Sequence, residues 1–292
     1  MRRLGLALAL VITAAGATAH ENFEVNGDDC TSRNFRWDGR QSFIAKETLD
    51  GRGLRSIKAN VTQSPVSVIG DSAGGYSIDV CKAAAFAEDL NAIRVTLVGD
   101  ELRATGPKGR DWTVLYRIHV PRGADVQVDA KNGPVSFRDI DGGKIVAHSS
   151  NGPLSLSNVS ADVDASTTNG PIRVNGGSGN MKLQASNGPL SVQLDGNAWE
   201  GGTLDASTKN GPLSVKLPRG YNSGVVVESS GRGPLSCRAA GCDQWRAEQR
   251  RIHDDDDDDY GWNDRPRRIE LGNGRADVHL STVNGPVTIK DE

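Results

Sequence analysis

The stretch TTNGPIRVNGGSGNMKLQASNGPLSV, residues 167–192, contains Asn-Gly-Pro twice, and each time an apolar residue follows at once. After each proline, apolar and polar residues alternate, as in IRV and LSV. Alternation with a period of two is typical of a strand that buries one face. A turn followed by such a strand, written twice within 26 residues, indicates a structural repeat.

The same unit recurs along the chain, with its proline at 134, 153, 171, 189, 212, 234 and 286, so the spacings are 19, 18, 18, 23, 22 and 52. The unit at 234 alone carries Arg232 where the other six carry Asn. A second alternating strand precedes each unit, and in five units an Ala lies two or four residues before the Asn, so the inward and outward parity is kept. We predict structural turns at Asn132, Gly133, Pro134, Asn151, Gly152, Pro153, Asn169, Gly170, Pro171, Asn187, Gly188, Pro189, Asn210, Gly211, Pro212, Asn284, Gly285 and Pro286.

Each motif has the residues of a corner. Asn-Gly accepts positive φ at low cost, and Pro fits the first residue of a strand. Coils of about 18–23 residues, stacked about 4.8 Å apart, would bury a continuous core that no single coil can form. We therefore predict an all-β chain, a parallel β-solenoid (β-helix) with short coils. An antiparallel β-sandwich, with Asn-Gly in hairpin turns, remains the alternative.

The chain divides into three parts. Residues 1–19 have a basic start, an apolar run and Ala17-Thr18-Ala19, which predicts a signal peptide cleaved near Ala19. No later apolar stretch has the roughly 18 residues of a membrane span, so we expect a soluble exported protein, periplasmic or secreted. Residues 20–53 would form an N-terminal cap, and residues 54–292 the solenoid, beginning with a degraded repeat at 63–68. Before the repeats we expect strands at 57–61, 65–69, 76–81, 93–98 and 112–120, and a short helix at 83–90.

Composition limits the core and the partners. Of the 292 residues 36% are hydrophobic and 5% aromatic, so the core must be thin and aliphatic. A formal net charge of −3 gives no reason to expect a nucleic-acid partner. We expect no cofactor.

The four cysteines are expected to form disulfides, because an exported chain matures in an oxidising compartment. Cys237 and Cys242 enclose only four residues and are expected to pair, which leaves Cys30 to pair with Cys81. Free thiols are the alternative. The absence of a CxxC spacing argues against zinc.

The segment YRIHVPRGADVQVDAKNGPVSF, residues 116–137, followed by NGPLSV-type coils, resembles the bacterial DUF4097 family of adhesin-like repeat proteins. The resemblance covers about residues 54–292 and is most specific at 120–123 and Asn132-Gly133. It implies a β-solenoid in the envelope or at the cell surface. The adhesin name is largely a label for the fold and does not establish adhesion.

The charged insertion at residues 238–268 departs from that pattern, and it contains six consecutive aspartates. Carboxylates suit a hard cation, yet adjacent side chains cannot all converge on one ion, and the Asp-x-Asp-x-Asp-Gly spacing is missing. Runs of like charge are usually solvated, so an acidic loop is the favoured interpretation. The weaker candidate is a cation site formed by Asp254, Asp255, Asp256, Asp257, Asp258 and Asp259.

Stacked coils would also align outward polar residues. We expect one column of Asp129, Val146, Asp164, Gln184, Asp205 and His279. Asp164 and Asp205 would lie two coils, about 10 Å, apart, near the separation of the paired carboxylates of a glycosidase. No aromatic sugar platform accompanies them. We also expect His119, His148 and His279 to point outward. The aromatic residues outside the strands serve either as partner anchors or in local packing; they are Trp199, Trp245, Tyr260 and Trp262.

These patterns favour an exported, non-catalytic solenoid that binds or scaffolds in the bacterial envelope or at the surface, including adhesion, with an unknown protein or polysaccharide as partner. One alternative is a carbohydrate-active β-helix enzyme, a polysaccharide lyase or hydrolase. The other is a periplasmic accessory protein that contacts a partner through residues 238–268.

Overall fold

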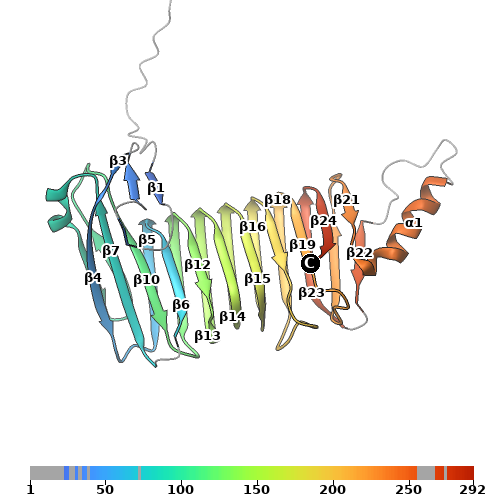
Figure 1. Ribbon diagram of the computed structural model, residues 1–292, viewed down its shortest axis with the longest axis horizontal. Helices are drawn as coiled ribbons and strands as arrows, with labels where there is room; N and C mark the ends of the chain where they lie inside the picture. Colours follow the sequence, from blue (N-terminus) through green and yellow to red (C-terminus); the bar gives the residue numbers. More distant parts are fainter. Residues whose placement is uncertain are drawn as a thin grey trace, which may run out of the picture.

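The computed structural model describes residues 23–25, 30–31, 35–37, 40–71, 74–254, 267–272 and 275–292. The predicted signal peptide, residues 255–266 and the side chain of Asp254 lie outside that description. The described chain is all-β: one large, mostly parallel sheet and a small antiparallel sheet of β1(Phe23–Val25), β2(Phe35–Trp37) and β3(Arg40–Gln41). Figure 1 shows the strands of the large sheet side by side along the long axis.

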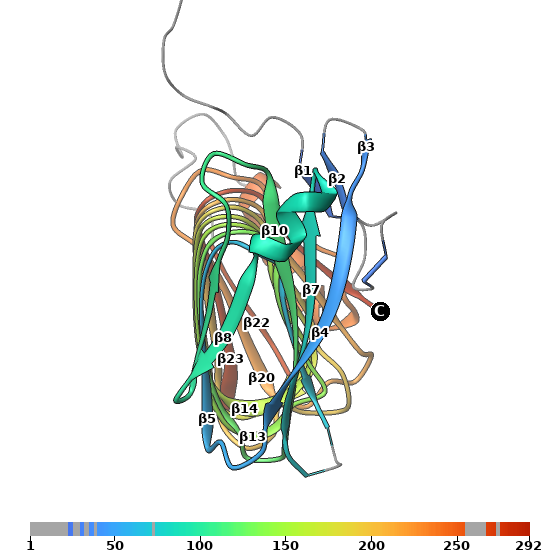
Figure 2. The same cartoon turned by 90° about the vertical axis from the view of Figure 1, so that its left-hand side faces the viewer.

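The repeats form flattened coils, and each coil places one strand in each of two walls (Figure 2). We call them wall A and wall B. Wall A contains β5(Ser56–Gln63), β11(Asp125–Asn132), β13(Asp141–Asn151), the second half of β14(Leu154–Asn169), β16(Met181–Asn187), β18(Leu204–Asn210), β23(Ala276–Asn284) and β20(Gly224–Ser229). Wall B contains β6(Val66–Gly70), β12(Val135–Arg138), the first half of β14, β15(Ile172–Ser178), β17(Leu190–Gln193), β19(Leu213–Leu217), β24(Val287–Asp291) and β21(Leu235–Cys237).

Neighbouring coils pair in parallel and in register, corner on corner. One inward column of wall A runs through Val126, Ile145, Val163, Met181, Leu204 and Val278. All six side chains are buried. The predicted inward and outward parity is therefore confirmed, and the pairing at the Asn-Gly motifs is parallel, not that of hairpins. The degraded repeat is also confirmed, since Gln63 and Val66 pair with Asn132 and Val135.

The coils do not stack in chain order. The last coil, β23–β24, lies between β18–β19 on one side and β20–β21 on the other. The charged residues 290–292 at the end of the sequence therefore do not form an edge of the stack, because β24 is flanked on both sides. The strand β22(Arg268–Leu271), which follows the charged insertion, belongs to no coil and pairs antiparallel with the outer edge of β20.

An antiparallel group closes the N-terminal end of the stack. In wall B, β4(Phe43–Gly51), β7(Tyr76–Ala84) and β10(Trp112–Val120) pair antiparallel, and β10 then pairs parallel with β6. In wall A, β8(Arg94–Val98) pairs with β9(Glu101–Thr105), which joins β5. The short helix expected at 83–90 is displaced, because β7 continues to Ala84 and the 3-10 helix η1 spans Ala87–Ala92.

The first disulfide fastens the N-terminal segment to this end. Cys30 is bonded to Cys81, with Cα atoms 5.5 Å apart. A second, small core lies beside the bond, where Phe35 and Trp37 pack on Cys81, Ala83 and Leu115. The disulfide therefore holds a separate apolar cluster on the outside of the antiparallel group.

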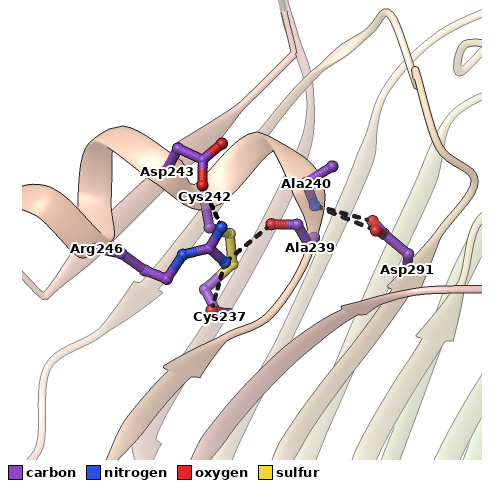
Figure 3. Close-up of a disulfide and its surroundings, with 7 residues drawn as sticks. All are labelled: Cys237, Ala239, Ala240, Cys242, Asp243, Arg246 and Asp291. Atoms are coloured by element: carbon purple, nitrogen blue, oxygen red, sulfur yellow. Dashed lines mark hydrogen bonds and ion pairs between the residues drawn. A yellow bond between two sulfur atoms is a disulfide. The ribbon is translucent and has the colours of Figure 1, made fainter.

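The second disulfide, Cys237–Cys242, lies at the opposite end, with Cα atoms 6.0 Å apart (Figure 3). It precedes a helix, α1(Asp243–Asp254), within the segment that the sequence suggested was only a charged loop. Arg246 donates to the carbonyls of Cys237 and Ala239, at 3.1 and 3.2 Å, and pairs with Asp243. These contacts fix the start of the helix against the last layer of wall B.

Replacing Cys237 and Cys242 together by Ala is expected to lower the free energy of unfolding by about 2 kcal/mol, because a bridge over so short a loop restricts the unfolded chain only modestly. Urea unfolding followed by circular dichroism measures this. The comparison is with the unmodified chain under the same oxidising conditions, in which Cys30–Cys81 stays intact in both proteins. An unchanged midpoint in the double variant would contradict the prediction.

Candidate functional site

The asparagines of the motifs form one hydrogen-bonded ladder along the stack. The side-chain amide of Asn151 donates to the amide oxygen of Asn132 at 3.0 Å, and Asn169 donates to Asn151 at 2.9 Å. The ladder continues through Asn187, Asn210 and Asn284, with distances of 3.1, 2.9 and 2.9 Å. Asn284 is the neighbour of Asn210 in the stack, so the ladder includes the last coil, β23–β24.

The glycines of the motifs are required by close approach. A Cβ on Gly170 would lie 2.0 Å from the carbonyl oxygen of Gly152, and one on Gly211 would lie 2.0 Å from that of Gly188. Positive φ, the reason inferred from the sequence, occurs at Gly133, Gly152 and Gly188, where φ is 120°, 159° and 156°, but not at Gly170, Gly211 or Gly285. The prolines stack as well: the amide after each motif proline donates to the carbonyl of the proline in the next layer, as from Leu154 to Pro171 at 2.9 Å. The motif is thus structural.

Arg232 has a place in this ladder that the sequence alone did not explain. Gly233 packs on the Gly285 carbonyl, so the Arg232 coil is the terminal layer. At the other end, Gln63 takes the position of Asn in the first layer. The two residues that replace Asn therefore stand at the two ends of the ladder.

Wall A presents outward side chains in columns, and the predicted column needs correction. Val146, Asp164, Asp205 and His279 share one column with Lys182 between the aspartates. Asp129 and Gln184 belong to the neighbouring column. The prediction aligned the coils on the repeat Ala, but this Ala lies two residues before the Asn in some coils and four residues before it in others.

A shallow depression lies on wall A around that column. Three carboxylates and two lysines line it: Asp162, Asp164, Asp205, Lys144 and Lys182. Asn180 also lines it and donates to Asp162 at 3.0 Å. The sequence placed Asp164 and Asp205 on one face but missed Asp162 and the two lysines, which come together only through the stacking.

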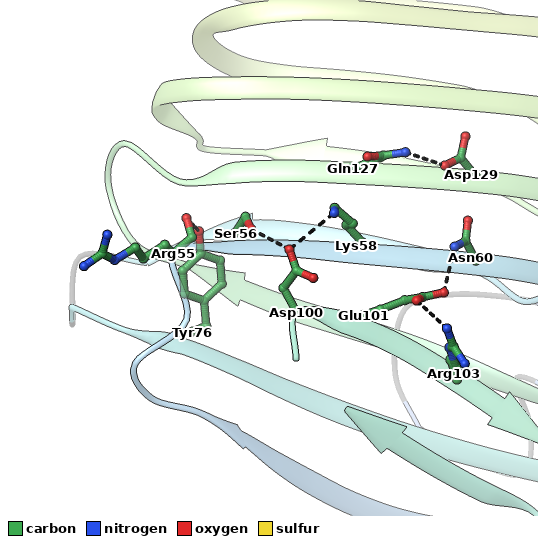
Figure 4. Close-up of polar contacts among 10 residues, drawn as sticks. All are labelled: Arg55, Ser56, Lys58, Asn60, Tyr76, Asp100, Glu101, Arg103, Gln127 and Asp129. Atoms are coloured by element: carbon green, nitrogen blue, oxygen red, sulfur yellow. Dashed lines mark hydrogen bonds and ion pairs between the residues drawn. The ribbon is translucent and has the colours of Figure 1, made fainter. Parts of the chain in front are cut away.

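A polar cluster occupies wall A at its N-terminal end (Figure 4). Ser56 donates to Asp100 at 2.7 Å, and Lys58 lies 3.6 Å from the same carboxylate. Asn60 and Arg103 donate to Glu101 at 3.0 and 2.7 Å. The hydrogen bond from Ser56 holds the pKa of Asp100 below its ordinary value, and Arg103, then Asn60, lower the pKa of Glu101.

This cluster predicts a pH effect with a definite sign. A carboxylate whose pKa is lowered by folding stabilises the fold above its unfolded pKa, ordinarily 4.5 for Glu101, and this contribution is lost as the pH falls through the lowered value. Replacing Glu101 by Gln should therefore reduce the drop in Tm between pH 6 and pH 3. Thermal unfolding at the two pH values tests this. Glu200→Gln, at an exposed glutamate, is the matched control, and an equal drop in both variants would refute the effect.

Wall B carries two outward columns of a different kind. The first reads Ser67, Ser136, Ser155, Arg173, Ser191, Ser214, Thr288 and Ser236. The second reads Ile69, Arg138, Ser157, Asn175, Gln193, Lys216 and Lys290. Within the coils neither column contains a carboxylate; in the antiparallel group the first column continues through Arg117 to Asp79. Asp139 and Asp195 follow these strands at the corner, beyond the two columns.

The other predicted site residues fall as follows. His148 and His279 are exposed, and His119 is half-buried, 3.7 Å from Asp79. Among the described residues no group of three His, Cys, Asp or Glu could hold a metal ion. The proposed cation site of Asp254–259 lies outside the described side chains and stays a prediction.

The described aromatic residues of the loops pack locally. Trp199 is buried, and its indole N–H donates to the Gly179 carbonyl at 2.9 Å. Trp245 is half-buried against the main core. Tyr260 and Trp262 lie outside the part of the chain that the structure describes. Local packing therefore accounts for Trp199 and Trp245.

The stacked coils and structural corners define an all-β repeat protein of mostly parallel sheet. The family model described as Toastrack DUF4097 matches residues 89–237, about half of the chain. The chain belongs to this DUF4097 family, as the sequence resemblance predicted.

Three solved structures are similar at low identity. A "putative cell adhesion protein" from Clostridium sporogenes is 13% identical, with a TM-score of 0.30, over 86% of this chain and 100% of that one. A "putative adhesin" from Bacteroides fragilis is 10% identical and one from Parabacteroides distasonis 8% identical, each with a TM-score of 0.35 over 86% of this chain and 97% of the other. Likeness at this level says nothing about what the present chain binds. The comparison with curated proteins gives no match.

Proposed function

We propose that this chain is an exported β-solenoid that binds a component of the bacterial envelope or cell surface through a lateral wall, without catalysing a reaction. The observation that carries this proposal is the pair of walls whose outward side chains stand in straight polar columns across successive coils. Such columns offer the same groups at a constant repeat of about 4.8 Å, which suits an extended or repetitive partner.

Export is supported by the basic and apolar start of the sequence and by the two disulfides. No described helix is long and apolar enough to cross a membrane. Expression in a bacterial host with the first residues intact, followed by mass spectrometry, should give a chain that starts at His20. A chain that keeps its first 19 residues would contradict export.

Binding is tested by sedimenting the purified full chain with insoluble envelope material from its own bacterium. We expect the chain to enter the pellet and to be released by high salt. Deleting residues 255–266 tests the alternative that the charged insertion contacts the partner. A chain that stays in the supernatant would refute lateral-wall binding, and release caused by the deletion alone would favour the accessory-protein hypothesis.

A second candidate function rests on the depression in wall A, where three carboxylates and two lysines lie together. Paired carboxylates are the machinery of glycoside hydrolysis. An assay on a panel of polysaccharides, with Asp164→Ala as the variant, tests this candidate. Turnover that disappears in the variant would support an enzyme, and turnover that persists would exclude this depression as its site.

A further inference from the structure

We propose that wall B binds an extended anionic polysaccharide that lies along the stack axis, across the coils. The inference rests on the proposed lateral-wall binding, and it adds the wall, the direction of the ligand and its chemical class.

Within the coils, wall B is positively charged. From β6 to β21 its two outward columns hold four cations, Arg138, Arg173, Lys216 and Lys290, and no carboxylate. Arg173, Lys216 and Lys290 form no ion pair with any residue that the structure describes. On wall A, by contrast, outward positions carry Asp125, Asp129, Asp162, Asp164, Asp205 and Asp277. Wall A also carries Lys131, Lys144, Lys182 and Lys209, which balance part of its negative charge, whereas the coils of wall B have an excess of positive charge.

Three of the cations are regularly spaced. Arg138 lies in the layer of Ser136, Arg173 two layers further, and Lys216 two layers further again. At about 4.8 Å per layer, these three cations are about 10 Å apart along the axis, and Lys290 lies one layer beyond Lys216. This spacing is of the order expected for a glycan that carries one acidic group on every second sugar. It is far sparser than the phosphates of a nucleic acid.

Two of the cations form an unfavourable pair of like charges. Lys216 and Lys290 lie directly opposite each other in adjacent layers. Like charges in this position destabilise a sheet. The nearest terminal carboxylates have other partners, since Asp291 accepts from the Ala240 amide at 3.2 Å and Glu292 accepts from Gln193. An anionic group bound across the two lysines would relieve the repulsion.

The surface of wall B between the cations is formed by small polar side chains. Between the cations the first column consists of Ser and Thr, whose hydroxyls can donate and accept hydrogen bonds. Such small side chains let a polymer approach the sheet closely. The columns contain no aromatic residue on which a sugar ring could stack. Recognition would therefore depend on charge and hydrogen bonds, which favours an acidic glycan over a neutral one.

The experiment uses the full chain and three immobilised probes. Hyaluronan carries a carboxylate on every second sugar, polygalacturonate on every sugar, and dextran carries none. The wall B variant combines Arg138→Gln, Arg173→Gln, Lys216→Gln and Lys290→Gln. The matched control removes four cations from wall A, by Lys131→Gln, Lys144→Gln, Lys182→Gln and Lys209→Gln, so both variants change the net charge equally. Circular dichroism verifies that each variant folds.

We expect the unmodified chain to bind hyaluronan in a salt-dependent manner and to bind dextran much more weakly. The wall B variant should bind hyaluronan about 30-fold more weakly, from four exposed charge contacts, and the control should stay within about twofold. A further variant, Ser191→Tyr, keeps every charge but places a bulky side chain on the surface between the cations. It should weaken binding to hyaluronan as well.

Several results would overturn the inference. These are no binding to either acidic probe, equal binding to dextran, or equal losses in the two four-residue variants. Self-association that the wall B variant abolishes, seen by sedimentation, would make the acidic wall A of a second copy the occupant. If the wall B variant still sediments with envelope material, the proposed function stands and this inference fails. If the unmodified chain binds hyaluronan but not the envelope, the proposed function fails alone.

Discussion

A chain that ends after residue 274 is expected to lose the folded state of its C-terminal third. The deleted coil, β23–β24, is an interior layer and pairs with four strands, two on each side. Its inward side chains Val278, Leu280, Val287 and Ile289 are buried. Burying four such side chains contributes about 6–12 kcal/mol, comparable to the total stability of a domain, about 5–15 kcal/mol. Thermal unfolding and limited proteolysis measure the loss.

The control separates the lost layer from a merely shorter chain. A protease site placed within residues 255–266 of the full chain would be cut after folding. The C-terminal fragment should then remain bound through gel filtration, because the layers on both sides still hold it. A truncated chain that keeps the Tm and protease resistance of the full chain would show that the last coil is not an interior layer.

The sequence was sufficient to predict the repeat, the corners and the parity of the strands. These features depend on residues close together in the chain, such as the apolar alternation after each Pro. The order of the coils is different, because every coil presents the same inward pattern and can pair with any other. Two signals pointed to the exception: the spacing of 52 residues before Pro286, and Arg232 in place of Asn.

The candidate walls were only partly predictable for a related reason. Which outward residues share a column depends on the register between coils. Aligning the coils on the repeat Ala gives a wrong register where that Ala shifts by two residues, and an outward side chain is then assigned to the next column. Asp129 was therefore placed with Asp164, and Lys182 was missed. The cations of wall B are far apart in sequence, and only the stacking aligns Arg138, Arg173 and Lys216.

The helix α1 shows another limit of pattern-based interpretation. Its sequence, DQWRAEQRRIHD, is mostly polar, and its fit to the end of the stack depends on Trp245 and on the hydrogen bonds of Arg246 to two carbonyls. Those carbonyls belong to Cys237 and Ala239, at the end of a strand. The helix is thus stabilised by tertiary contacts, which a charged segment does not reveal by its composition.

Gly285→Ala is expected to be among the most damaging single methyl additions to this chain. A Cβ at Gly285 would lie 1.9 Å from the carbonyl oxygen of Gly211 and 2.5 Å from its carbon. Both layers are fixed here, because the Gly211 amide donates to Asn284 and the Leu213 amide to Pro286, each at 2.9 Å. Relief therefore requires the layers to separate, which also breaks the ladder between Asn210 and Asn284. We expect a loss of about 3 kcal/mol or more, and a fall in Tm of roughly 6–12 °C.

Gly75→Ala is the matched control, because a Cβ there meets no atom within 4 Å. Its φ is not in the left-handed region, so the substitution should change the stability by no more than about 0.5 kcal/mol. Thermal unfolding of the two variants, under the same conditions, isolates the effect of the close approach. Equal melting temperatures would mean that neighbouring corners are further apart than the stacked glycines require. The role of glycine in the motif would then return to the positive φ that the sequence first suggested.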